Sequence, residues 1–434
     1  MRQMPPSDPS AAPPFPRSRV LLVSHNFPPT IGPESSLVRL NTIDLVRRGW
    51  DVTVLTTTTT HMHQKMDGKS LEGLPAGLCV MRTPSWEAVF RNRFPRIGSL
   101  TLSALMKVLP EIFLAWALSA VPAGLRWLNL YGPAVIYSRA TKHVSNLAGL
   151  FLKRKTGLPW VAHFSDPWLG YPMNPIQIWL GRQIEKRIFN EADAVVTVSH
   201  QLATHFAELY PLSASKIVVI PHGYEPMMDS KPAEQPLNTG RALTVLHAGS
   251  FMPGLREPLA LFMGLAKLSE RTPLHGRIMV TLVGDDTRRY QDMADECGVS
   301  DIVELRDSLP FHECQQRIAT SDLLLVIDTP GFDGVFLPTK LIEYLAHRKP
   351  VIGITERGSA VHDVLQECGL SFADIQDPKS IADAFENMLA LWADGELDSA
   401  RPNRESADNY AIENVNRKLD DLLLTLSSKL TDKA

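Results

Sequence analysis

One stretch in the last third of the chain constrains the fold most strongly. Residues 323–327 and 351–354 are short apolar runs bounded by turn-forming residues, as in parallel strands that are covered on both faces. Between them, apolar residues recur at helical spacing over 341–345. This order predicts a right-handed strand–helix–strand crossover. It places the loop at 329–338 at the carboxyl ends of the strands, where open α/β sheets bind ligands.

Two charged side chains open the predicted helix. Lys340 and Glu343 are three residues apart, so they share one face of its first turn. One interpretation is a surface ion pair. The other is a ligand site in which the lysine neutralises phosphate, the glutamate binds sugar hydroxyls and the helix N-terminus adds partial positive charge. The spacing alone is compatible with both.

A resemblance to a known family favours the ligand site. The segment from Pro338 to Ala346, Pro-Thr-Lys-Leu-Ile-Glu-Tyr-Leu-Ala, resembles the donor-binding segment of the family 4 glycosyltransferases. This implies the α/β GT-B fold, in which two Rossmann-like doubly wound domains face a central cleft. The usual family pattern has two glutamates eight positions apart. Glu343 matches the second, whereas Val335 stands at the first, a departure shared by a polysaccharide-assembly branch.

The N-terminal half shows the same alternation of elements. Apolar runs at 19–24 and 51–56 flank a loop and a helix, and Gly32 in that loop would let backbone amides approach a diphosphate closely. The spacing of a full dinucleotide-binding fingerprint is missing, so a simple tight turn is the alternative. The stretch Phe-Pro-Pro-x-x-Gly at 27–32 resembles the opening of the same family, which implies that Gly32 faces the donor diphosphate.

A polar tip ends the strand predicted to begin at Leu158. Asp166 is followed by proline at a carboxyl end, where a carboxylate has few structural roles, so it is predicted to act catalytically on the acceptor side. Family members commonly have His or Arg directly before this Asp, where the chain has Ser165. His163 would project to the same side as Ser165 and is predicted to substitute catalytically. The alternative for His163 is a half-buried strand residue bonded to backbone.

The second half supplies the other predicted donor-binding residues. A strand ending at Gly249 and Ser250, with Arg256 before a helix, predicts a phosphate clamp, because arginine can bind phosphate through two nitrogens. The alternative is an arginine that satisfies a helix end or a surface carboxylate. The position of Arg256 resembles that of the basic residue that holds the donor phosphates in the family. Further donor-binding residues are predicted at later strand ends: Gly284, and Leu309 and Phe311 in the loop that contacts the base in relatives.

Length and composition set the organisation. The 434 residues exceed one compact core, so two α/β domains are expected. The net charge of −3 gives no reason to expect nucleic acid as a partner, and the four cysteines lack metal-ligand or disulfide spacing, as in a reducing cytoplasm. We predict a flexible lead-in at 1–17 without a signal-peptide core, an acceptor-side domain at 18–226, a linker at 227–241, a nucleotide-sugar-binding domain at 242–400, and a C-terminal helix at 401–434 that returns to the first domain.

Residues 85–130 interleave arginines with tryptophans and phenylalanines at helical spacing. This pattern suits a segment that lies on an anionic membrane surface. The alternative is an outer helix that packs its apolar stripe inward. Charged residues and prolines interrupt the segment, so no membrane span is expected. We therefore expect a cytoplasmic protein, peripheral on the inner face of the membrane.

The resemblance implies transfer of a glycosyl group from a nucleotide-sugar, with UDP- or GDP-sugars favoured, to an acceptor hydroxyl with retention of configuration. A lipid-linked saccharide in bacterial exopolysaccharide assembly is the expected acceptor. Arg256 and Lys340 are assigned to the donor phosphates and Glu343 to donor hydroxyls, which also makes it a catalytic candidate. No cofactor or metal is expected, because the family generally works without one and Asp285 with its acidic neighbour lies in the base-side domain.

Two alternatives remain on the sequence. A nucleotide-sugar 2-epimerase shares the two-domain arrangement but would show a denser set of carboxylates and histidines. A catalytically degenerate sugar-nucleotide-binding subunit is kept open by Val335 and Ser165, the two departures from the family pattern.

Overall fold

The computed structural model describes residues 17–58, 66–93, 105, 107–140, 143–168, 173–226 and 240–431. Residues 1–16 of the predicted lead-in and 227–239 of the predicted linker lie outside these residues, whereas Arg17 is the first residue of a strand. The chain forms two compact units. Unit 1 contains residues up to 197 together with 206–220 and 416–434, and unit 2 contains 198–205 and 221–415.

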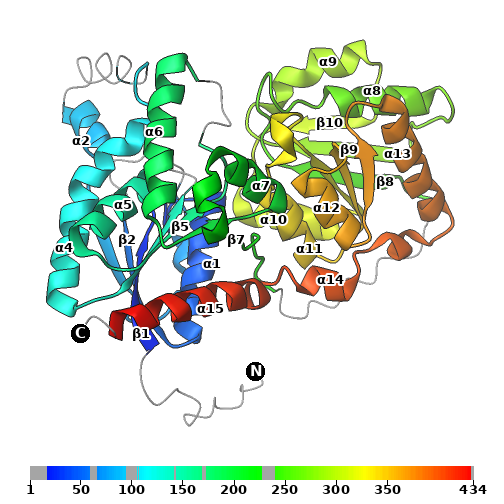
Figure 1. Ribbon diagram of the computed structural model, residues 1–434. Helices are drawn as coiled ribbons and strands as arrows, with labels where there is room; N and C mark the ends of the chain where they lie inside the picture. The colour runs from blue at the N-terminus through cyan, green and yellow to red at the C-terminus, as the bar shows by residue number, and fades with distance from the viewer. Residues whose placement is uncertain are drawn as a thin grey trace, which may run out of the picture. The chain divides into compact units, whose positions relative to one another are not determined.

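Unit 1 is built on a parallel sheet of seven strands in the order β3-β2-β1-β4-β5-β6-β7. Figure 1 shows helices on both faces of this sheet. The strands are β1 (Arg17–Val23), β2 (Trp50–Thr57), β3 (Cys79–Thr83), β4 (Val135–Ala140), β5 (Trp160–Phe164), β6 (Ala194–Thr197) and β7 (Ile217–Val219). The helices are α1 (Pro33–Arg47), η3 (Gly68–Leu71), α2 (Trp86–Arg93), η4 (Ile112–Trp116), α4 (Ala117–Tyr131), α5 (Val144–Thr156), α6 (Pro175–Glu191) and η5 (Pro211–Lys216), with α7 (His200–Leu209) divided between the units.

Unit 2 is built on a parallel sheet of six strands in the order β10-β9-β8-β11-β12-β13. The strands are β8 (Leu243–Ala248), β9 (Ile278–Val283), β10 (Val303–Arg306), β11 (Leu323–Ile327), β12 (Val351–Thr355) and β13 (Ser371–Asp374). The helices are α8 (Leu259–Ser269), η6 (Thr287–Tyr290), α9 (Gln291–Glu296), α10 (Phe311–Thr320), η7 (Phe332–Gly334), α11 (Thr339–Ala346), α12 (Ala360–Glu367), α13 (Pro378–Ala393), η8 (Leu397–Ala400) and α14 (Arg404–Asp408), with α15 (Ile412–Thr431) divided between the units. The predicted crossover is β11–α11–β12.

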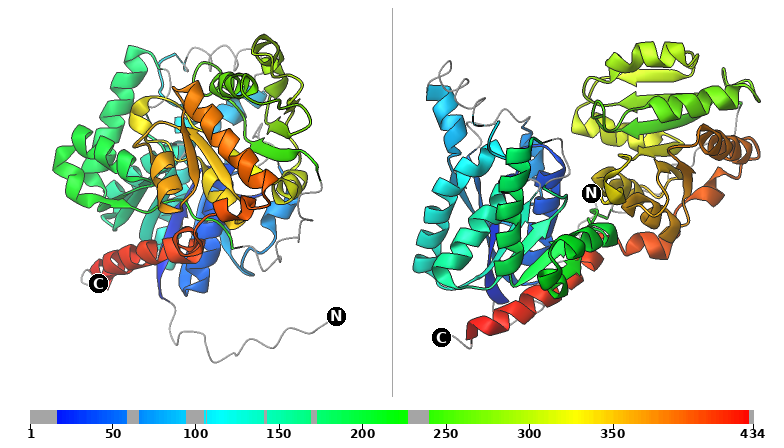
Figure 2. Two further views of the ribbon diagram at one scale, coloured as in Figure 1. Left: turned by 90° about the vertical axis from the view of Figure 1, so that its right-hand side faces the viewer. Right: turned by 45° about the horizontal axis from the view of Figure 1, so that its top comes forward.

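The C-terminal helix α15 belongs to unit 1 from residue 416 onwards. Figures 1 and 2 show α15 running beside α1 and β1. Two buried polar contacts tie it there. The amide of Asn41 on α1 donates to Asn416 at 2.7 Å, and the indole of Trp50 on β2 donates to Asp420 at 2.7 Å. The last segment of the chain is therefore part of the unit in which the chain begins.

Two local boundaries differ from the predictions. The run 134–137 predicts a strand that ends at Tyr137 and is followed by a carboxyl-end loop at 138–143. β4 instead continues to Ala140, so Arg139 lies within a buried strand. Phe311 is the first residue of α10, so only Leu309 of that predicted pair lies in the loop.

The segment at 85–130, for which a membrane surface and an inward-packed helix were the two interpretations, contains both exposed and buried aromatic side chains. Trp116 and Trp127 are 0% and 5% exposed, so this part of the segment packs into unit 1 as the inward-facing alternative expects. In the described part of the chain, every helix is too short or too polar to cross a bilayer.

Candidate functional site

The carboxyl edge of the second sheet gathers most of the predicted donor-binding residues. β8 ends at Ala248, and the next two residues, Gly249 and Ser250, form the loop above it. Arg256 returns to this loop, because its Nη2 donates to the carbonyl oxygen of Ser250 at 2.8 Å. The hydroxyl of Ser250 in turn accepts from the backbone N–H of Asp285 at 3.0 Å. The loops after β8 and β9 are thus joined where the sequence predicts a phosphate clamp.

Gly284 is required by this joining of loops. A Cβ at residue 284 would lie 2.5 Å from the carbonyl oxygen of Gly249, far inside van der Waals contact. The backbone of the Gly249 loop therefore lies directly against the backbone at the end of β9. Such close approach of two backbones explains a glycine at this position without any direct ligand contact.

Lys340 and Glu343 lie one helical turn apart near the start of α11, beside the same loop. The Nζ of Lys340 lies 3.2 Å from Oε2 of Glu343, and the two side chains are 32% and 31% exposed. The Cγ of Lys340 lies 3.9 Å from the position of a Cβ on Gly249. Burial alone would lower the pKa of Lys340, but the Glu343 carboxylate and the Cys314 thiol outweigh it and raise the pKa. The ion pair of the first interpretation exists, and it keeps a cation beside the glycine loop.

Buried side chains lie beneath the glycine loop and the start of α11. Tyr344 is fully buried, and its hydroxyl accepts from the backbone N–H of Ala248 at 2.9 Å, which fixes α11 to the end of β8. Burial lowers the pKa of His247 to about 4, so this histidine is neutral at physiological pH. Burial raises the pKa of Asp328 to about 6, although the Thr355 hydroxyl and the backbone N–H of Thr329 both donate to it.

The loop after β11 is strained. Gly331, Phe332, Asp333 and Gly334 all have φ between +53° and +82°. Each of the two non-glycine residues costs on the order of 1 kcal/mol in this conformation. A Cβ on Gly334 would lie 2.7 Å from Cα of Ser359, so the loop is held against the start of α12. Val335, where the family pattern has a glutamate, is 1% exposed and packs inward.

The structure brings most, but not all, predicted donor-binding residues to this edge. The described contacts join Gly249, Ser250, Arg256, Gly284 and Lys340 in one neighbourhood. Leu309 precedes α10, whose Cys314 thiol acts on the pKa of Lys340, so this element borders the same neighbourhood.

Unit 1 has a second cluster at the carboxyl edge of its sheet. Gly32 is the N-cap of α1 with φ +147° and ψ 162°, a conformation that is essentially restricted to glycine. It turns the chain so that Glu34 enters the first turn of α1, where its side chain is 5% exposed. The space around the missing Cβ of Gly32 is open within 4 Å.

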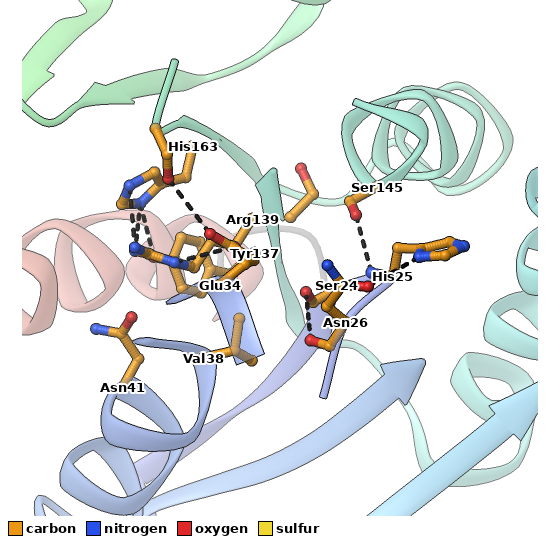
Figure 3. Close-up of polar contacts among 12 residues, drawn as sticks. Ser24, His25, Asn26, Glu34, Val38, Asn41, Tyr137, Arg139, Ser145 and His163 are labelled. Atoms are coloured by element: carbon orange, nitrogen blue, oxygen red, sulfur yellow. Dashed lines mark hydrogen bonds and ion pairs between the residues drawn. The ribbon is translucent and has the colours of Figure 1, made fainter. Parts of the chain in front are cut away.

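Figure 3 shows Glu34, Tyr137, Arg139 and His163 pointing toward one another. The Arg139 Nε lies 3.2 Å from Oε1 of Glu34, and its Nη1 lies 3.1 Å from a ring nitrogen of His163. The hydroxyl of Tyr137 lies 2.9 Å from Nδ1 of His163. The Arg139 Nη1 lies 3.1 Å from both ring nitrogens, and because guanidinium carries only donors, His163 accepts this hydrogen bond. Burial alone would lower the pKa of Arg139, but Glu34 and Tyr137 outweigh it and raise the pKa.

His163 is therefore more deeply placed than a half-buried strand residue. It is 1% exposed and contacts side chains from β4. Ser165 is also buried, and its hydroxyl lies 3.4 Å from Oε2 of Glu34. Asp166 lies beyond the end of β5, so strand alternation does not set its direction, and it is partly exposed.

Sequence reasoning missed Glu34 and Arg139. An arginine inside the otherwise uncharged run from 134 to 140 is the signal that was available, because a strand buried on both faces admits a charge only when it is paired. Its partner is 105 positions earlier and is not marked by any spacing. No group of three or more His, Cys, Asp or Glu side chains within the described ranges is placed to hold a metal ion.

Comparison with known proteins bears on both units. The model of the glycosyl transferase 4-like domain matches residues 44–223. The recognised resemblance to glycosyltransferase family 4 is confirmed. The chain is also 28% identical over 165 residues to the D-inositol 3-phosphate glycosyltransferase of Stackebrandtia nassauensis, covering 35% of this chain and 36% of the relative. The match thus spans about a third of that relative's length.

Solved structures resemble the chain over almost its whole length. Sucrose-phosphate synthase from Thermosynechococcus elongatus superposes with a TM-score of 0.63 at 16% identity, covering 95% of this chain and all of that one. HepE from Anabaena, solved with UDP and glucose, superposes with a TM-score of 0.59 at 14% identity, covering 94% and 99%. At these identities the likeness shows the fold, and the prediction of two Rossmann-like GT-B domains is confirmed.

Proposed function

We propose that this chain is a glycosyltransferase that moves a hexosyl group from a nucleotide-sugar to an acceptor hydroxyl. The observation that carries the proposal is the joining of Gly249, Arg256 and Lys340 at the carboxyl edge of the second sheet. Two cations beside a partly exposed glycine backbone suit a diphosphate. A UDP- or GDP-sugar is the proposed donor.

The reaction requires stabilisation of the departing diphosphate and placement of the acceptor hydroxyl. In this proposal Arg256 and Lys340 neutralise the diphosphate, and Glu343 binds hydroxyls of the donor sugar. Asp166 and His163, in unit 1, are assigned to the acceptor. His163 would act by holding hydrogen bonds, as it does with Tyr137 and Arg139. Retention of configuration and the absence of a metal remain part of the proposal.

A thermal-shift panel with UDP-, GDP-, ADP- and dTDP-sugars tests donor binding, since a ligand that binds only the folded state raises Tm. We expect one donor class to raise Tm, and Lys340→Ala to abolish that rise. Lys267→Ala is the matched control, because Lys267 forms the same type of pair with Glu270 three residues later on α8, at 2.7 Å. Equal loss in both variants would remove Lys340 from the donor site.

Nucleotide release in the presence of a membrane extract tests transfer. Asp166→Asn is expected to abolish release while the donor still raises Tm. Asp51→Asn, at an exposed ion pair with Arg19, should leave release unchanged. Conversion of the donor into an isomer without any acceptor would favour a 2-epimerase. Donor binding with no release under any condition would favour a degenerate binding subunit.

We further propose that the acceptor is a lipid-linked saccharide and that unit 1 docks on an anionic bilayer. An apolar–basic surface carries this step. Its exposed apolar members are Trp86 and Phe90 on α2, Leu105 and Val108 on the next described segment, and Ile176 and Trp179 on α6. Both helices begin at the carboxyl edge of the sheet, and Figure 1 shows them at the same end of unit 1.

Charge complementarity supports an anionic partner for this surface. Among the described side chains at 86–93, 107–109 and 174–190, all exposed charged residues are basic: Arg93, Lys107, Arg182, Lys186 and Arg187. The two acidic residues of these ranges, Glu87 and Glu185, are buried. Hydrogen bonds from Asn174 and Gln177 to the carbonyls of Lys107 and Leu109 hold the segments side by side. Exposed tryptophan with basic residues is typical of proteins that bind membrane surfaces.

Sedimentation with vesicles tests the docking. The protein should bind vesicles of phosphatidylcholine with about 30% phosphatidylglycerol, because this anionic content makes polybasic binding effective. It should not bind vesicles of pure phosphatidylcholine. Trp179→Glu is expected to weaken binding at least tenfold. Leu212→Glu, at a 94% exposed leucine on η5, is the control and should bind normally. Equal binding by both variants, or preference for RNA over vesicles, would refute this partner.

A further inference from the structure

A buried carboxyl group lies beneath the loop that carries Asp166. Glu185 on α6 is 1% exposed, and the hydroxyl of Tyr210 donates to its Oε2 at 2.6 Å. The backbone N–H of Trp168 is a second donor to the same carboxyl group. Trp168 is two residues after Asp166, with only Pro167 between them. The carboxyl group of Glu185 therefore holds the far end of a very short segment whose near end is Asp166.

The Trp168 side chain fixes this segment in unit 1. It is 2% exposed and stacks on the ring of His143, with 4.8 Å between ring centroids and an interplanar angle of 15°. The ring of His143 also contacts Phe164 at the end of β5, at 5.6 Å. Pro167 restricts φ, so the backbone has little freedom between Asp166 and Trp168. A displacement of Trp168 must then be passed to Asp166.

The charge of Glu185 is poorly compensated. Burial raises its pKa to about 7, while Tyr210, the Trp168 amide and Arg182 act in the opposite direction. Among the described residues, the cation that acts on this carboxylate is Arg182, which is exposed, so an ionised Glu185 would rely mainly on its hydrogen-bond donors. On α5 and η5, which pack against α6, Lys153 pairs with Asp193, Arg154 pairs with Glu191, Lys155 is exposed, and Lys216 donates to the carbonyls of Asn190 and Ala192. His143 stacks on Trp168.

We propose that Glu185 is a pH-sensitive positioning residue for the 165–168 loop, closing it when neutral and loosening it when ionised. Ionisation is expected to draw water toward the carboxylate and to displace the Trp168 backbone from it. The link from loop position to catalysis rests on the proposed role of Asp166, whereas the coupling of Glu185 to the loop does not. The decline of transfer activity at alkaline pH would then be caused by the ionisation of Glu185, a residue that does not contact the substrate.

Hydrogen exchange of a peptide spanning 160–168, corrected for the intrinsic effect of pH, tests the coupling directly. With pKa values of about 4.5 in the open loop and about 7 in the closed loop, protection should fall about tenfold between pH 6 and pH 8.5. Glu185→Gln keeps the shape and remains neutral, so its protection should change by less than about twofold over the same range.

Glu191→Gln is the matched control, because Glu191 lies on the same helix but pairs with Arg154 at the surface. This control should behave as the wild type. Protection that is equal at both pH values in the wild type, or an equal fall in Glu185→Gln, would overturn the proposal.

Activity provides the second readout. In the wild type, kcat should decline as pH rises through about 7, and Glu185→Gln should lack this decline while retaining the wild-type KM. If the exchange result appears but no nucleotide-sugar is turned over, the proposed function fails and the loop switch stands. If both proteins lose activity along the same alkaline limb, Glu185 does not control the loop that carries Asp166.

Discussion

The buried pair of Arg139 and Glu34 gives the sharpest prediction for stability. Both side chains are almost fully buried, at 3% and 5% exposed, and the closest charged atoms are 3.2 Å apart. At an effective dielectric constant of about 20, their attraction is on the order of 5 kcal/mol. Most of this attraction offsets the cost of removing both charges from water, so the pair as a whole contributes little net stability.

Removing only one partner leaves an uncompensated charge in the core of unit 1. Arg139→Met is therefore expected to lower the free energy of unfolding by about 3–5 kcal/mol. The double variant Glu34→Leu with Arg139→Met should recover most of that loss, because neither charge remains. Urea denaturation followed by circular dichroism, arranged as a double-mutant cycle, measures the coupling between the two positions.

The exposed pair of Arg19 and Asp51 is the control for this cycle. Its atoms are 3.1 Å apart, but its side chains are 41% and 52% exposed. Substitution of either residue should cost less than about 1 kcal/mol, because water screens the pair. If Arg139→Met costs no more than Arg19→Met, the buried cluster does not carry the charge that its geometry implies.

Three further outcomes are expected. The free energy of unfolding of the wild type should fall by up to about 3 kcal/mol as pH rises from 4.5 through 7, because the raised carboxyl pKa favours the folded state only while Glu185 is protonated. Thermal unfolding measures this fall, and the Glu185→Gln variant should not show it. Gly284→Ala should cost about 1–3 kcal/mol and abolish donor-induced stabilisation, since the new Cβ would press on the Gly249 carbonyl; an unchanged Tm and donor response would contradict this. Tyr344→Phe should cost about 1–3 kcal/mol in urea denaturation by leaving the Ala248 amide without its acceptor, and no loss would indicate that another group takes its place.

The sequence predicted the sheet architecture well because parallel strands leave a strong local signal. Apolar runs such as 323–327 and 351–354 are buried on both faces, and their spacing along the chain is set by the crossover helices. The predicted strand boundaries were wrong where a polar residue interrupts the apolar run. β4 was predicted to end at Tyr137, but it continues through Arg139 because Glu34 pairs with the guanidinium.

The candidate site was predictable to the extent that its residues are close in sequence. Lys340 and Glu343 share a helical turn, and Gly249 and Arg256 share one loop, so local patterns indicate them. The Glu34 cluster and the Glu185 contact join residues from different elements, and only the packed fold brings them together. The catalytic and donor-binding roles of the individual residues remain predictions, which the variants above test.

The return of α15 to unit 1 has a consequence for how the protein is made. Asn416 and Asp420 provide buried partners for Asn41 and Trp50. All of unit 2 is synthesised before these two partners. Unit 1 is therefore completed only after unit 2 has been made, and until then the polar groups of Asn41 and Trp50 lack their partners. A nascent chain stalled before residue 416 should expose the surface of α1 and β2 that α15 covers, which makes that surface a natural place for a chaperone to bind during synthesis.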